Sequence, residues 1–110
     1  MEGKRIRKGD VVVISFPFTD FSGEKRRPAL VVGISEEHVV VAFITTRATG
    51  LKRWHVRLAH GEGSGLVSPS VVRCDKILSI DTQLISGAIG VVPHVEIKEV
   101  DRKLRRLLKL

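Results

Sequence analysis

Short runs of β-branched and other apolar residues, separated by turn-forming residues, recur along most of this chain. Such runs are typical of β-strands, and several of them at short intervals favour a small, strongly bent all-β barrel. The glycine- and serine-rich residues 60–69 are expected to form a mobile surface loop. The six expected strands span residues 11–16, 29–34, 38–45, 54–58, 70–80 and 85–92.

The last part of the chain has the periodicity of a helix. Pro93 suits the start of a helix, because proline fixes its own φ angle and lacks an N–H. Acidic residues come early in this stretch and basic residues late, an order that complements the helix dipole. We therefore predict a C-terminal amphipathic helix that closes one side of the barrel, with its basic outer face in solvent. Its apolar residues at helical spacing are Ile97, Val100, Leu104, Leu107 and Leu108.

The composition fits one small domain with an anionic partner. A chain of 110 residues can bury a hydrophobic core, so we expect a single domain over residues 1–110. Nineteen Lys and Arg against twelve Asp and Glu give a net charge of +7, which favours contacts with phosphates but fits an ordinary soluble surface or an acidic protein partner equally well. No apolar run is long enough to cross a membrane, and a single cysteine excludes an internal disulfide framework. A cytoplasmic protein is the simplest interpretation.

A hairpin near the N-terminus combines aromatic and basic residues. Residues 8–32 read KGDVVVISFPFTDFSGEKRRPALVV, in which two apolar runs are joined by a polar, glycine-containing loop. The loop ends in the cations Lys25, Arg26 and Arg27, and the proline that follows fixes the backbone beside them. Arg27 is placed to hold a phosphate through two parallel hydrogen bonds, or else to remain solvated or pair with an acidic neighbour.

The fifth expected strand contains the sequence Arg73-Cys74-Asp75. Residues two apart in a strand point to the same face, so Arg73 and Asp75 should stand side by side while Cys74 points to the opposite face. A carboxylate beside a guanidinium can deprotonate a hydroxyl and stabilise a phosphorane, but it can also be a plain surface ion pair. Cys74 is expected to be a small core residue, because no Cys/His pair can be recognised.

Hydroxyl and aromatic side chains lie near these cations in the sequence. Thr45 and Thr46 end the third expected strand just before Arg47, where their hydroxyls can donate to a phosphate oxygen or cap a turn. Phe18 and Phe21 lie in the first loop, where an exposed ring can stack on an unpaired base. Most aromatic residues of so aromatic-poor a chain should nevertheless be needed in the core.

Several classes of enzyme find no support in the sequence. The four histidines lack zinc-ligand spacing, and the single cysteine cannot complete a site. There is no phosphate-binding glycine loop before a helix and no nucleophile-elbow serine. The carboxylates that a metal-dependent nuclease needs are scattered along the chain. We therefore expect neither a metal nor a cofactor.

Six motifs occur in the order found in one family. They are GD before an apolar strand, FPFTD, RPALVV, ITT, SPSVVRCDKILSID, and IG before the terminal helix. On these motifs the chain resembles the PemK/MazF family of toxin endoribonucleases, in its PemK-like branch, over nearly its whole length. The resemblance implies a mainly β fold, a small SH3-like β-barrel with a C-terminal helix, and a homodimer. It also implies a type II toxin that cleaves single-stranded mRNA at short sequences without a metal and is neutralised by a cognate antitoxin.

The resemblance also assigns roles to individual residues. Arg27 matches the arginine of the family's RP motif and would clamp the scissile phosphate, to which Thr45 would donate a hydrogen bond. Arg73 and Asp75 match an RCD-type pair, with Asp75 as general base and Arg73 as general acid or, more plausibly for a guanidinium, as charge stabiliser. The implied reaction is attack of a ribose 2′-hydroxyl on the adjacent phosphate, which leaves a 2′,3′-cyclic phosphate. The residues expected to bind RNA are Lys25, Arg26, Phe18, Thr46 and Arg47.

Two other functions remain open. Some PemK-branch members carry a histidine in the first loop that assists the reacting phosphate, whereas Ser22-Gly23-Glu24 offers none here. This difference favours a non-catalytic module that binds RNA or an antitoxin on the same barrel. A gyrase poison of the related CcdB type has less support, because the chain ends Leu-Leu-Lys-Leu and lacks the C-terminal Trp-Gly-Ile of that group.

Overall fold

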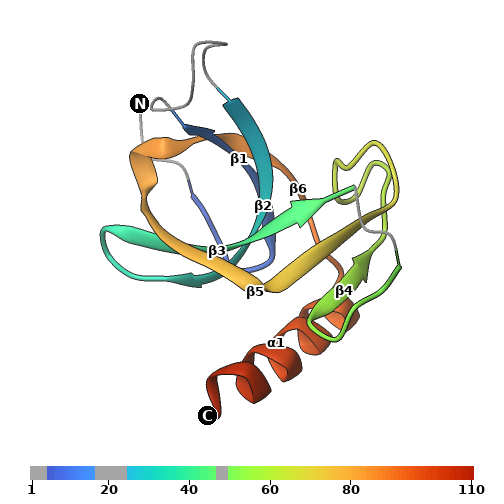
Figure 1. The fold of residues 1–110 in the computed structure, drawn as a ribbon. Helices are drawn as coiled ribbons and strands as arrows, with labels where there is room; N and C mark the ends of the chain where they lie inside the picture. The colour runs from blue at the N-terminus through green and yellow to red at the C-terminus, as the bar shows by residue number, and fades with distance from the viewer. Residues whose placement is uncertain (1–4, 17–24, 47–49) are drawn as a thin grey trace.

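A computed structural model describes residues 5–16, 25–46 and 50–110. Six strands and a C-terminal α-helix follow one another along these residues, so the mainly β fold and the terminal helix are confirmed (Figure 1). Every expected strand is found, although β2 begins earlier than predicted and a short 3-10 helix, Thr82–Leu84, precedes β6. The elements are β1 (Asp10–Phe16), β2 (Lys25–Ile34), β3 (His38–Thr45), β4 (His55–Leu58), β5 (Ser70–Asp81), β6 (Ile85–Val91) and α1 (His94–Leu108).

The strands form a single antiparallel sheet in the order β4-β5-β3-β2-β1-β6. The sheet is strongly bent, and α1 lies across its β4–β5 end (Figure 1). Within the described residues β4 and β6 are edge strands that do not pair with each other, so strand pairing leaves the sheet open. The SH3-like barrel therefore stays a prediction.

The loop after β4 reaches the opposite edge of the sheet. The N–H of Val91 in β6 donates to the carbonyl oxygen of Gly63 at 2.8 Å, and Ser64 and Leu66 are buried. Gly65 has a φ angle of 76°, and a Cβ atom on Gly65 or Gly90 would collide with the backbone of the other segment. The segment expected to be a mobile surface loop is thus hydrogen-bonded and partly buried against β6.

Both faces of the sheet are buried, each by its own group of apolar side chains. Because neighbouring residues of a strand point to opposite faces, burial on both sides explains the unbroken apolar runs of β1, β2 and β3. We call one group the strand cluster; it contains Val12, Ile14, Ala29, Val31, Val39, Val41, Ile80 and Ile85. We call the other the helix-side cluster; it contains Val11, Leu30, Ala42, Ile44, Val56, Leu58, Leu66, Val72, Cys74, Val92 and Val100.

Helix α1 begins after Pro93 and packs on the helix-side cluster through Val100, Ile97 and Leu104. The predicted start of the helix is confirmed. Lys103 does not belong to the solvated basic face, since its Nζ donates to the carbonyl oxygens of Arg53 at 2.8 Å and of His55 at 2.9 Å. This lysine therefore joins the helix to the beginning of β4. No helix in the described part of the chain is both long and apolar enough to span a membrane.

Candidate functional site

Three of the predicted catalytic side chains converge in one pocket. Arg27 from β2, Thr45 from β3 and Arg73 from β5 line a hollow of about 300 Å³. Arg27 lies two residues before Ala29, and Thr45 two residues after Phe43, so both extend rows of side chains that belong to the strand cluster or pack against it. The pocket is therefore the polar end of a buried apolar sheet face.

Lys76 lies in the same pocket, which the sequence did not predict. Simple alternation along β5 would point Lys76 away from Arg73. The pairing of β3 with β5 is irregular between Ala42 and Ile44, and both cations line the pocket beside Phe43. The Nζ of Lys76 is 5.5 Å from the centre of the Phe43 ring, a cation–π distance. Three cations and a hydroxyl thus surround a space suited to a phosphate.

Arg73 and Asp75 form an ion pair on one face of β5, as the spacing predicted. Their closest atoms, Nε and Oδ1, are 3.6 Å apart, and the side chains are 39% and 34% exposed. This distance is too long for a good hydrogen bond. Asp75 does not line the pocket that contains Arg27 and Thr45, and lies beside it next to Arg73.

Cys74 points to the other face, where it is fully buried in the helix-side cluster. Burial raises the pKa of its thiol to about 11, so the thiolate is disfavoured near neutral pH. The prediction that Cys74 is a core residue is confirmed.

His55 is a further residue beside the site, which the spacing of the histidines in the sequence did not indicate. It lies directly opposite Arg73 in the β4–β5 pairing and is 7% exposed. Neither Nδ1 of His55 nor Nε of Arg73 has a hydrogen-bond partner among the described residues, although both atoms are buried. Burial lowers the pKa of His55, which favours the neutral ring. Only the strand pairing reveals this neighbour.

Two predicted RNA-binding residues face a second groove. Arg26 and Thr46 line a hollow of about 370 Å³, together with Leu66 and Val67 from the loop that packs on β6. Alternation along β2 and β3 separates them from the pocket that contains Arg73. Arg27 and Thr45 line both hollows and connect them.

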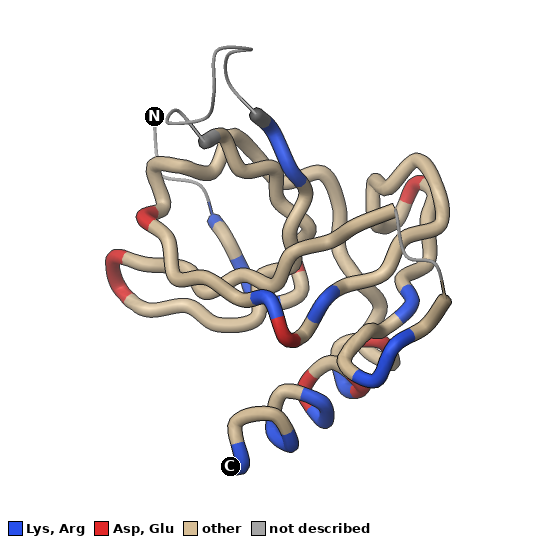
Figure 2. The backbone as a smooth tube through the Cα atoms, in the orientation of Figure 1, with Lys and Arg blue, Asp and Glu red and all other residues tan. Residues whose placement is uncertain are grey.

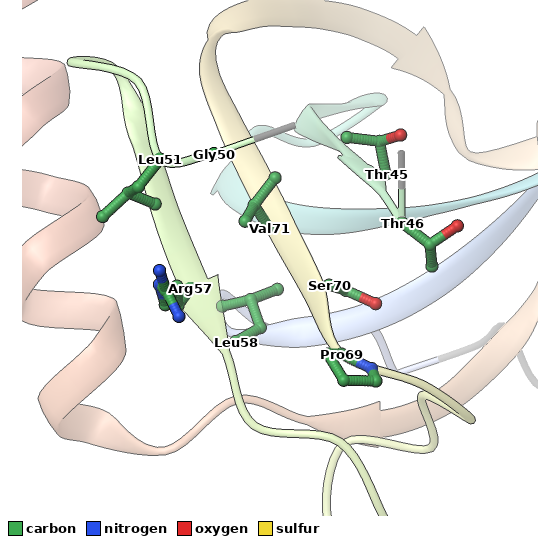
Figure 3. A pocket seen from close by; sticks show the side chains of 9 residues that line it. All are labelled: Thr45, Thr46, Gly50, Leu51, Arg57, Leu58, Pro69, Ser70 and Val71. Carbon is green, nitrogen blue, oxygen red and sulfur yellow. The ribbon is translucent and has the colours of Figure 1, made fainter. Parts of the chain in front are cut away.

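A third hollow, of about 270 Å³, lies at the end of β3 (Figure 3). Figure 3 shows Thr45 and Thr46 on one side of β5, and Arg57 with Leu51 on the other. Thr45 lines all three hollows and therefore stands at their junction.

The structure describes the remaining predicted RNA-binding residues only in part. Lys25 begins β2, but its side chain is not described, and Phe18 and Arg47 lie outside the described residues. Figure 2 shows basic residues along α1 and at the start of β2, and basic and acidic residues together in β5. In the described ranges no group of three or more His, Cys, Asp or Glu side chains is placed to hold a metal ion.

The family and the fold of the chain are known from other proteins. Residues 7–108 match the model of the PemK-like, MazF-like toxins of type II toxin–antitoxin systems. The chain belongs to this family. No curated protein matches the sequence.

Solved structures of similar fold include MazF toxins. One is a MazE–MazF complex from Deinococcus radiodurans, with 26% identity, 96% of each chain covered and a TM-score of 0.76. Another is the Mycobacterium tuberculosis toxin MazF-mt6, with 24% identity, 92% of this chain and 97% of that chain covered, and a TM-score of 0.73. A mycobacterial endoribonuclease in complex with its cognate antitoxin has 16% identity, 96% coverage of each chain and a TM-score of 0.75.

Proposed function

We propose that this chain is the toxin of a type II toxin–antitoxin pair and a sequence-specific, metal-independent endoribonuclease. The observation that carries the proposal is the convergence of Arg27, Thr45 and Arg73 in one pocket of a chain that belongs to the MazF-like toxins. Fixed guanidinium groups and a hydroxyl are suited to bind a phosphodiester and the charge that develops on it. The net charge of +7 favours association with single-stranded RNA.

The proposed reaction is transfer of the phosphate to the neighbouring ribose hydroxyl. The 2′-oxygen attacks phosphorus as its proton passes to Asp75, and the bond to the 5′-oxygen breaks as that oxygen takes a proton from solvent water, which leaves a 2′,3′-cyclic phosphate and a 5′-hydroxyl. Arg27 clamps the phosphate and Thr45 donates to one of its oxygens. Arg73 stabilises the charge of the phosphorane, since a guanidinium remains protonated. The ion pair of Asp75 with Arg73 supports this role, since a carboxylate beside Arg73 would lie close to the ribose of a phosphate bound there.

We further propose that the chain folds as one domain, an SH3-like barrel, and acts in the cytoplasm as a homodimer. Its cognate antitoxin would silence it, as the solved complexes of MazE with MazF suggest. The hydrogen bond between the loop after β4 and strand β6 supports a barrel that is closed partly by a loop.

The second candidate is a non-catalytic module that binds RNA or the antitoxin. The position of Asp75 favours it, because this carboxylate lies outside the pocket and is paired with Arg73. Such a module would bind RNA in a salt-sensitive way and leave it intact.

Cleavage of single-stranded RNA in the presence of EDTA separates the two candidates. The purified toxin should release fragments with 2′,3′-cyclic phosphate ends, and Arg73→Ala and Asp75→Asn should abolish release. Arg102→Ala is the matched control, because this exposed arginine on α1 lines none of the three hollows. If the folded protein leaves RNA intact, the nuclease proposal is wrong. If Arg73→Ala cleaves RNA as fast as the wild type, the proposed site is wrong.

A further inference from the structure

A buried histidine stands behind the pocket rather than in it. His55 of β4 is paired with Arg73 of β5, and it does not line the hollow that Arg73 shares with Arg27 and Thr45. Its backbone carbonyl accepts a hydrogen bond from Lys103 of α1, which holds this end of β4 in place. The backbone of His55 is therefore held opposite Arg73, and its side chain is too little exposed to meet a substrate directly.

Two buried polar atoms at this position lack a hydrogen bond among the described residues, although Nε of Arg73 lies 3.6 Å from Oδ1 of Asp75 in their ion pair. Nδ1 of His55 and Nε of Arg73 are buried without a hydrogen bond to any described residue. The Nε–H of arginine can only donate, whereas Nδ1 of a neutral imidazole can accept. A buried polar atom without a hydrogen bond is destabilising, so a donor and an acceptor on paired residues favour a contact with each other, either direct or through one water.

We propose that His55 is a positioning residue for Arg73, whose Nε–H is held by Nδ1 of His55 through an ordered water. This contact would fix the plane of the guanidinium and leave its two terminal NH₂ groups free to bind the phosphate. The inference rests on the proposed ribonuclease site, and it adds a residue that the sequence comparison did not supply. His55 takes no proton from the substrate and acts only through Arg73.

The charges around the ring keep it in the required state. Burial is the largest influence and lowers the pKa of His55, and the cations Arg73, Lys52 and Lys103 lower it further. Asp75 is the opposing influence and raises this pKa. The neutral ring therefore dominates at neutral pH. On protonation Nδ1 becomes a donor, so it can no longer accept a hydrogen bond from the water that joins it to Arg73.

Paired substitutions test the idea. Asn places its Oδ1 at the same distance along the side chain as Nδ1 of histidine, so His55→Asn keeps an acceptor that His55→Leu lacks. We expect His55→Leu to lower kcat about ten- to a hundredfold at nearly unchanged KM, and His55→Asn to recover most of that loss. Because burial lowers the pKa of His55, kcat of the wild type should hold at about pH 6.5, the ordinary pKa of histidine, and fall only at lower pH, and this fall should be weaker in His55→Asn. Equal kcat for the wild type and a folded His55→Leu would overturn the proposal.

A spectroscopic measurement keeps the inference separate from the nuclease proposal. The Nε–H signal of Arg73, assigned by its loss in Arg73→Lys, should exchange slowly with solvent in the wild type and in His55→Asn. It should exchange fast in His55→Leu, while thermal melts report that all variants are folded. If the wild type cleaves no RNA, the proposed function fails and this signal alone decides the role of His55. Fast exchange in the wild type would contradict it.

Discussion

Thr45 occupies an unusual place for a single small residue, because its side chain borders all three hollows at the end of β3. Under the proposed function, a hydroxyl at this junction would donate to an oxygen of the bound phosphate. The neighbouring hydroxyl of Thr46 borders only two of the hollows and is absent from the one that contains Arg73.

The threonine hydroxyl should therefore matter more than its methyl group. Thr45→Val keeps the size and β-branching but removes the donor, and we expect about a hundredfold loss of kcat. Thr45→Ser should retain most activity, and Thr46→Val is the control at the next position. Rates of cleavage of a fluorescent RNA measure the difference. Similar rates for Thr45→Val and Thr46→Val would contradict this role.

The buried thiol of Cys74 should be nearly inert. With a pKa of about 11, roughly one thiol in a thousand is ionised at pH 8, compared with about a quarter for an exposed cysteine. We expect alkylation by iodoacetamide at pH 8 to be at least about a hundredfold slower in the folded protein than in guanidinium chloride. Mass spectrometry of timed samples measures both rates. Equal rates would mean that the thiol is accessible.

Part of this site could be predicted from the sequence. Arg73 and Asp75 share a face because residues two apart in a strand always do, and Cys74 is buried for the same reason. Lys76 and His55 could not be predicted. The position of Lys76 depends on an irregular pairing of β5 with β3, and the position of His55 beside Arg73 depends on the pairing of β4 with β5. Neither feature has a local signal in the sequence.

At the level of the elements, the loop after β4 packs closely against strand β6. Of the described glycines, those at this contact have the shortest distances from an added Cβ atom to another part of the backbone. Gly65 and Gly90 lie where the two backbones meet, whereas Gly87 on the same strand faces open space. The glycines of this loop predicted a mobile surface loop, but the close approach to β6 explains Gly65, whereas a Cβ atom on Gly61 or Gly63 would meet nothing within 4 Å.

A methyl group at Gly90 should disturb this contact. We expect Gly90→Ala to lower the free energy of unfolding by about 2 kcal/mol or more, because the added Cβ would overlap the backbone of Ser64. Gly87→Ala should change it by less than about 0.5 kcal/mol. Urea unfolding followed by circular dichroism measures both. An equal effect of the two substitutions would show that the loop does not pack on β6.

At the scale of the whole molecule, the strands and the helix were predictable because each is a local run with its own periodicity. The order of strands in the sheet and the docking of the loop on β6 were not, because both depend on contacts between residues far apart in the chain. The predicted basic outer face of the helix was right except for Lys103, whose long side chain turns back to β4.

The free energy of unfolding should fall on acidification, because the buried His55 resists protonation in the folded protein. Burial lowers its pKa in the folded protein below the ordinary value of about 6.5, so below that pH the unfolded chain binds a proton that the folded chain resists. Stability is therefore fully present above about pH 6.5 and decreases as pH drops from there toward the folded pKa. His55→Asn should weaken this decrease, and the exposed His60→Asn should not. Urea unfolding at pH 7.5 and 5.5 provides the comparison, and identical pH dependence in all three proteins would refute it.

The hydrogen bond from Val91 to Gly63, together with the contacts of Lys103 at the start of β4, has a consequence for assembly. Unpaired strand edges invite other chains to add a strand, which leads to aggregation. Here one edge donates to a loop of its own chain, and the other is a strand of four residues whose first carbonyl is occupied by a lysine. A partner that added a strand to this sheet would have to displace these contacts. Binding to the faces and hollows of the molecule leaves them intact and is therefore favoured over strand addition.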